Sequence, residues 1–144
     1  MAREHPLSAA ARATLITAYL RHAAEQRDDD AWAFDAVNEV ANGGDAEASW
    51  DLVVELVRRS PDEQLGYVAA GPLEDMVRRH GPAIIEWIEG EAQRDPRFQW
   101  ALGCIWLQAG ELPSGTEQRV VAASGGEIAV LPGPALERLL RPDT

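Results

Sequence analysis

The fold of this chain is indicated most clearly by residues 50–63, WDLVVELVRRSPDE. Its apolar side chains recur at the i, i+3, i+4, i+7 spacing of one helical face, while its charged side chains fall mainly on the other. Ser60-Pro61 then marks a boundary, because a serine can cap the next helix and a proline in the first turn loses no hydrogen bond. We therefore expect a helix over 46–59 and another over 61–69, opened by a capping box of Ser60 with Glu63.

Glycine, proline and aspartate set the other expected boundaries. Gly-Pro pairs that begin at Gly71, Gly81 and Gly133 predict sharp corners, because the glycine can end one helix left-handed and the proline can open the next. Asp45 and Asp95 are typical helix caps. The helix after Asp95 is almost wholly apolar, so we expect it to be the central and most buried one. The expected helices cover residues 8–26, 31–41, 46–59, 61–69, 72–80, 82–94, 96–108 and 134–141.

The segment after Gly110 supports two interpretations. Ser114 to Glu117 has the pattern of a capping box and favours a helix over 118–124. The alternative is a β-hairpin that turns at Gly125-Gly126 and uses the apolar residues before and after it as strands. We favour the helix, and residues 116–131 stay open between the two.

Together these boundaries predict an all-α fold, a single compact domain of about seven short helices. The helices are expected to pack as antiparallel helical hairpins, similar in architecture to helical-repeat proteins. Short helices are not stable alone in water, so their packing must stabilise them. We expect residues 1–110 to form the helical domain and residues 111–144 to form a C-terminal extension packed on the same domain.

The composition is strongly acidic. The chain carries 24 acids against 13 bases, which gives a formal net charge of -11, and every base is an arginine. Direct nucleic-acid binding needs a basic face, and no basic run here exceeds a pair of arginines, so we do not expect it. An acidic surface would attract a basic protein partner, or would serve only to keep the domain soluble. The composition does not indicate the oligomeric state.

Three features bear on the cellular location. No stretch approaches the roughly 18 apolar residues of a membrane span, so we expect no membrane association. Residues 1–6 lack the apolar core of a signal peptide. The single cysteine, Cys104, lies in an apolar run and is typical of a buried thiol in a reducing compartment. We therefore expect a cytoplasmic protein.

Several short motifs carry a family resemblance. The densest is AAGPLEDMV at 69–77, which is accompanied by WDLV at 50–53, SPDE at 60–63, LG at 65–66 and HG at 80–81. With these motifs, residues 32–106 resemble an uncharacterised bacterial family of small helical proteins, a domain of unknown function with an Ala-Gly-Pro-Leu-Glu-Asp core. The resemblance implies a helical fold and brings no activity, ligand or partner.

Glu74, Asp75 and His80 are the most suggestive polar group, because carboxylates and an imidazole can bind a metal or move a proton. Adjacent residues on a helix point about 100° apart, and His80 lies five to six positions further on, so a site would need help from another helix. The structural alternative is that both acids stabilise a helix start and pair with arginines four residues on. The expected pairs are Glu74 with Arg78 and Asp75 with Arg79. We favour this alternative.

No other pattern points to catalysis or to a metal. Glu86, Glu89 and Glu91 lie close together, but neither Glu86 nor Glu89 has the histidine three residues on that helical di-iron sites use. His5 and His22 have no cysteine or histidine neighbour at zinc-ligand spacing. The sequence also lacks a serine-nucleophile motif and a phosphate loop. We therefore assign no catalytic residue, metal ligand or cofactor.

Five tryptophans are many for this length, and most are expected to fill the core. Trp32 and Trp87 are the candidates for an exposed patch, because acids, among them Asp35 and Glu86, lie near each of them in the sequence, and this mixture is common at interface anchors. These four residues join Glu74, Asp75 and His80 as candidate binding residues.

The leading hypothesis is a noncatalytic acidic protein–protein interaction module. Its concrete form is a small bacterial immunity or antitoxin-like protein that covers a basic surface of its partner. The rival is a small enzyme or ligand-binding domain whose cleft gathers Glu74, Asp75 or His80 with residues from another helix.

Overall fold

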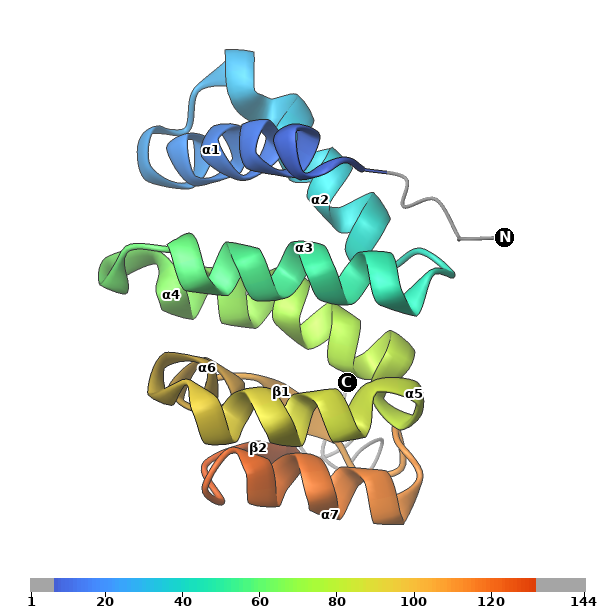
Figure 1. The fold of residues 1–144 in the computed structure, drawn as a ribbon. Coiled ribbons are helices and arrows are strands. Elements are labelled where there is room, and N and C mark those ends of the chain that lie inside the picture. The colour runs from blue at the N-terminus through green and yellow to red at the C-terminus, as the bar shows by residue number, and fades with distance from the viewer. Residues whose placement is uncertain (1–6, 132–144) are drawn as a thin grey trace, which may run out of the picture.

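Helices make up most of the part of the chain that the structure, a computed structural model, describes, residues 7–131 (Figure 1). The α-helices are α1 (Ala9–Glu25), α2 (Ala31–Ala41), α3 (Ala46–Arg59), α4 (Asp62–Val68), α5 (Glu74–Arg94), α6 (Pro96–Gly103) and α7 (Ser114–Ala123). A 3-10 turn (Asp28–Asp30) precedes α2, a π-helical segment (Ala69–Leu73) joins α4 to α5, and the strands are β1 (Trp106–Gln108) and β2 (Ala129–Leu131). The predicted helical fold class is confirmed, with one small parallel sheet in addition.

Side-chain caps fix three of the helix starts. Ser8, Asp45 and Asp95 each accept a hydrogen bond from a backbone N–H two or three residues further on, at 3.1, 3.1 and 2.9 Å. Each bond satisfies a donor that the first helical turn would otherwise leave unpaired. The predicted helices over 31–41 and 46–59 coincide with α2 and α3. Asp45 caps α3, whereas α2 begins without a side-chain cap.

After α3, helix α4, the π segment and α5 form one long helical run from Asp62 to Arg94. The first half of this run lies along α2. Two hydrogen bonds join the segments in the same order along both: Asn42 donates to Asp75 at 3.1 Å, and His80 Nε2 donates to the carbonyl of Gly43 at 2.7 Å. Before them on the two segments, Phe34 and Tyr67 both pack on the ring of Tyr19. This half therefore ends beside the turn between α2 and α3.

The second half of the run lies along α3, so the chain turns back at Gly81-Pro82. Trp87 packs on Trp50 with ring centroids 5.8 Å apart, and Glu91 binds Arg58 at 2.9 Å. Figure 1 shows the ribbon turning back at the right-hand end of α5, where its colour passes from light green to yellow. The chain therefore changes direction at Gly81, as predicted. The two separate helices expected over 72–80 and 82–94 are wrong, because α5 continues through Pro82 and Gly81 is not left-handed.

The corner predicted at Gly71-Pro72 is wrong. The backbone passes from α4 through the π segment into α5 without an interruption, so no new helix begins at residue 72. The N–H of Glu74 donates to the carbonyl of Ala69, five residues back. This wider turn accommodates Pro72, which has no N–H to donate to the carbonyl four residues before it.

Ser60 and Ser114 do not cap the helices that were expected to follow them. The hydroxyl of Ser60 donates to the carbonyl of Leu56 at 2.6 Å, and Pro61 occupies the N-cap position of α4. Ser114 is already the first residue of α7, after Pro113. A serine hydroxyl can bond backward to a carbonyl four residues earlier as readily as it caps the next helix, and the local sequence does not distinguish the two.

The apolar helix predicted over 96–108 is wrong in its second half. Helix α6 ends at Gly103, and the last three residues of the expected helix form β1. β1 pairs in parallel with β2, from Trp106 opposite Ala129 to Gln108 opposite Leu131. A strand that depends on a partner more than twenty residues away leaves little trace in the local pattern.

The segment after Gly110 contains features of both interpretations. Helix α7 confirms the favoured helix, and β2 covers most of the apolar run 128–131 that the hairpin would have used. β2 pairs with β1 in parallel, so the hairpin itself is wrong. Helix α7 lies beside α5 (Figure 1). The corner expected at Gly133-Pro134 and the helix over 134–141 lie outside the described residues.

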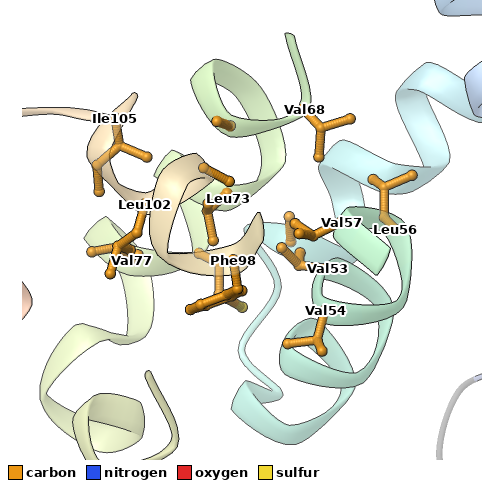
Figure 2. Packing of buried hydrophobic residues seen from close by; sticks show 14 of the residues in the cluster. Val53, Val54, Leu56, Val57, Val68, Leu73, Val77, Phe98, Leu102 and Ile105 are labelled. Atoms are coloured by element: carbon orange, nitrogen blue, oxygen red, sulfur yellow. The ribbon is translucent and has the colours of Figure 1, made fainter. Parts of the chain in front are cut away.

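Buried apolar side chains from α3, the π segment, α5 and α6 meet in the core. Figure 2 shows side chains of these elements together, among them Val53, Val57, Leu73, Val77, Phe98 and Leu102. Helix α6 contributes one face only, because Leu102 is fully buried whereas Trp100 is 56% exposed. Helix α6 is therefore not the wholly buried helix that its composition predicts.

Replacing Leu102 by alanine is expected to lower the free energy of unfolding by about 2–5 kcal/mol, the usual cost of emptying a fully buried leucine site. Trp100→Ala on the same helix is the control, and it should change this free energy by no more than about 1 kcal/mol. Urea denaturation followed by circular dichroism measures both. Similar losses in the two variants would contradict the one-sided burial of α6.

Candidate functional site

The π segment (Ala69–Leu73) joins α4 to α5 and packs against α2, and its sequence includes the Ala-Gly-Pro-Leu part of the motif that carries the family resemblance. π-helical turns are rare and occur frequently at functional sites. Because the segment is continuous with α4 and α5, it places residues before and after it on one surface. This surface is therefore a candidate functional site.

A groove of about 420 Å³ opens beside this segment. We call it the π groove. It is lined by Tyr19 from α1, Phe34 and Asn38 from α2, Tyr67 from α4, Ala70, Gly71 and Pro72 from the π segment, and Glu74, Asp75 and Arg78 from α5. Its volume lies in the range of small-ligand sites, roughly 300–1,000 Å³.

Three aromatic rings form one wall of the π groove. The ring of Tyr19 is almost parallel to that of Phe34, at 3° and with centroids 6.4 Å apart, and the ring of Tyr67 is tilted by 42° with centroids 6.1 Å apart. Tyr19 is buried, whereas Phe34 and Tyr67 keep 37% and 44% of their surface exposed. The two outer rings are therefore available to a ligand, and Tyr19 supports them from beneath.

The hydroxyl of Tyr19 is held in its neutral form. Burial raises the pKa of this phenol above its ordinary value, and the neighbouring Tyr67 and the carboxylate of Asp75 raise it further. A neutral phenol can donate and accept hydrogen bonds, but it cannot serve as an anionic base at physiological pH. Tyr19 is thus suited to binding rather than to proton abstraction.

Asp75 supplies the negative charge at one end of the π groove. Its Oδ2 accepts a hydrogen bond from the side-chain amide of Asn42 at 3.1 Å, and that amide also donates to the carbonyl of Asn38 at 2.9 Å. The pair with Arg79 that the sequence suggested is absent from the ion pairs of residues 7–131. The carboxylate of Asp75 is therefore positioned by an uncharged donor.

Glu74 attaches strand β1 to α5. One oxygen of Glu74 pairs with Arg78 at 2.6 Å, as the sequence predicts, and the other accepts from the backbone N–H of Trp106 at 3.1 Å. Arg78 in turn donates to the carbonyl of Trp106 at 3.1 Å and pairs with Glu111 at 3.0 Å. The two side chains together satisfy both backbone groups of Trp106, so Glu74 serves the fold.

His80 also stabilises the fold, at a place away from the π groove. It is buried, and its Nε2 donates to the carbonyl of Gly43 in the turn between α2 and α3. Glu74, Asp75 and His80 thus bind three separate partners and do not converge on one point. Only the two acids belong to the lining of the π groove.

The model of a protein family of unknown function, DUF6869, matches residues 21–128, three quarters of the chain. The chain belongs to DUF6869. No curated protein and no solved structure matches it. The match confirms the resemblance seen in the motifs and extends it beyond residue 106, so the DUF6869 region includes α7. It also includes every residue that lines the π groove except Tyr19.

The remaining candidate residues of the DUF6869 chain lie outside the π groove. Trp32 is exposed and lines a separate hollow with residues of α1 and of the 3-10 turn, and Asp35 is exposed nearby on α2. Glu86 is exposed on the second half of α5, where Trp87 packs on Trp50. These four side chains therefore do not form one patch with Glu74 and Asp75.

The sequence did not identify the aromatic wall or two further exposed tryptophans. Tyr19, Phe34 and Tyr67 come from three different helices and each resembles an ordinary core residue in its own helix. Trp100 and Trp106 were expected in the core, but they are 56% and 53% exposed. The useful signal was the Gly-Pro pair inside an otherwise helical pattern, which marks either a corner or a distorted helix.

Two buried carboxylates, for which the sequence predicted no structural role, join separate elements of the DUF6869 fold. Glu91 is 2% exposed and binds Arg58 and Arg94, each at 2.9 Å. Asp30 is bound at 2.7 Å by Arg21, whose hydrogen bond lowers the pKa of this carboxyl. Arginine can hold a carboxylate with two parallel bonds, so these contacts favour arginine over lysine at both sites.

Residues 7–131 contain no group of three or more His, Cys, Asp and Glu side chains placed to hold a metal ion. No helix in the same range is long and apolar enough to cross a membrane.

The neutral form of Tyr19 gives a testable pH dependence. Because the pKa of Tyr19 is higher in the folded chain, its contribution to stability is complete below the pKa of an exposed tyrosine, about 10, and is lost as the pH rises beyond it. The chain has no lysine, so few other groups titrate in this range. We expect Tyr19→Phe to flatten the fall in unfolding free energy between about pH 9 and 11.

Urea denaturation at a series of alkaline pH values measures this effect. Tyr67→Phe is the matched control and should keep most of the alkaline fall, because burial is the largest cause of the shift at Tyr19. An unchanged alkaline fall in Tyr19→Phe would show that Tyr19 does not titrate with folding.

Proposed function

We propose that this DUF6869 chain is a noncatalytic interaction module that binds a basic protein partner. The observation that carries the proposal is how its polar side chains are used. Glu74, His80 and Glu91, the buried groups best suited to acid–base chemistry, each join separate elements of the fold. The carboxylate of Asp75 and the exposed rings beside it line an open groove instead.

The charge of the chain supports a basic partner. A formal net charge of -11 creates a negative potential that attracts basic proteins and raises their association rate. Exposed aromatic side chains accompany this charge at Phe34 and Tyr67 in the π groove and at Trp32 and Trp87 elsewhere. Aromatic residues are common among the side chains that dominate binding energy at interfaces.

A concrete form of this function is an immunity or antitoxin-like protein of the bacterial cytoplasm, which neutralises a basic partner by covering its surface. Size and charge support this form, because a small acidic domain can cover such a surface without any chemistry of its own. A toxin gene beside the gene of this chain would favour it, and a metabolic operon would favour a different partner.

A small enzyme or ligand-binding domain is the second candidate, and the π groove favours it through its volume. Glu74 and Asp75 line the groove, but His80 is bonded elsewhere, so this candidate lacks an imidazole for proton transfer. The tyrosine hydroxyls and Asp75 remain as groups that can bind a small polar ligand. Tight binding of a metabolite without any partner protein would favour this candidate.

Affinity capture with the tagged full chain at physiological salt, followed by reconstitution with the purified captured protein, tests the proposal. We expect a basic partner whose Kd weakens at least severalfold between about 50 and 300 mM salt, because screening weakens attraction between surface charges. An unrelated acidic protein of similar net charge is the control for nonspecific capture. Recovery of no partner, or of one with salt-independent affinity, would contradict the proposal.

A further inference from the structure

The charge and the rings of the π groove fit one kind of occupant. We propose that the π groove binds the side chain of an arginine on the basic partner, with the guanidinium group stacked on Phe34 and Tyr67 and paired with Asp75. The inference rests on the proposed function and specifies the site at which the partner is recognised.

The charge for this contact comes from Asp75. The groove is lined by three ionised groups, and two of them, Glu74 and Arg78, pair with each other at 2.6 Å. Arg78 is further held by Glu111 and by the carbonyl of Trp106. Within the described chain, Asp75 is the lining carboxylate that no arginine neutralises, since its side-chain partner is the amide of Asn42. A cation entering the groove would therefore pair with Asp75.

The aromatic wall favours a planar cation. A guanidinium group is flat and weakly hydrated, and it stacks on aromatic faces, whereas the ammonium of lysine is compact and strongly hydrated. Phe34 and Tyr67 offer exposed ring surface next to the buried Tyr19. The neutral hydroxyl of Tyr19 adds no charge that would compete with Asp75. Arginine is therefore preferred to lysine, and an anion is disfavoured.

The probe is a blocked pentapeptide with one arginine between two pairs of glycines, added to the full chain labelled with nitrogen-15. We expect chemical-shift changes concentrated at the backbone amides of residues 67–75, with a Kd of order millimolar for a single side chain. The same peptide with citrulline, which has nearly the same shape but no charge, should bind at least about tenfold more weakly. The lysine peptide should bind roughly threefold or more weakly.

Two substitutions test the proposed contacts. Asp75→Asn removes the charge and keeps an oxygen for Asn42, and Tyr67→Ala removes the exposed ring. Each should weaken the arginine peptide by roughly three- to thirtyfold, the range of a cation–π or exposed ion-pair contribution. The controls are Asp62→Asn, which makes the same charge change, and Trp100→Ala, which also removes an exposed aromatic ring. Both lie outside the π groove and should leave the Kd within about twofold. Tyr67→Leu replaces Tyr67→Ala if the alanine variant does not fold.

Equal binding of the citrulline peptide, shift changes centred elsewhere, or equal weakening in the control variants would overturn the inference. If a captured partner binds Asp75→Asn as tightly as the unmodified chain, the arginine site is wrong and the interaction function stands. If no partner is captured, the interaction function fails, whatever the peptide shows.

Discussion

The hydrogen bond between His80 Nε2 and the carbonyl of Gly43 joins the two corners on which the helix packing depends. One corner connects α2 to α3, and the other, at Gly81-Pro82, turns the long helical run back on itself. With the corners side by side, the first half of that run lies along α2 and the second along α3. Asp75 then lies opposite Asn42, and Glu91 lies opposite Arg58. A residue that resembled a candidate for chemistry thus joins the two corners of the helix stack.

The π segment is the second constraint, because it keeps the helical run continuous where Pro72 would otherwise break it. Tyr67 before the segment and Asp75 after it therefore share one surface, and α1 and α2 complete that surface with Tyr19 and Phe34. The π groove is a product of this arrangement rather than of any one motif. Glu74 and Asp75 are adjacent in sequence but have different roles. Glu74 holds β1 against α5, whereas the carboxylate of Asp75 is open to a ligand.

Much of the fold was predictable wherever a boundary was local. Asp45 and Asp95 cap the helices that follow them, and the corner at Gly81 is where its sequence places it. Gly71-Pro72 has the same Gly-Pro pattern as Gly81-Pro82, but there the helix continues through a π turn. The local sequence does not distinguish a π turn from a helix break, because tertiary packing decides between them. The end of α6 and the start of β1 depend on pairing with β2, which no local pattern contains. In the site, the sequence identified Glu74 and Asp75 but not the aromatic wall, whose rings come together only through packing of α1, α2 and α4.

His80 stabilises the fold, whereas Asp75 belongs to a binding groove. The most direct measurement compares unfolding free energy and arginine-peptide affinity in His80→Ala. We expect the free energy of unfolding to fall by about 2–4 kcal/mol, because the variant removes a buried side chain and leaves the Gly43 carbonyl without its donor. We also expect a peptide Kd within about twofold of the unmodified chain under conditions where the variant is folded. If the His80→Ala variant is as stable as the unmodified chain and no longer binds the peptide, His80 acts in binding and not in the fold, and the role assigned to it is wrong.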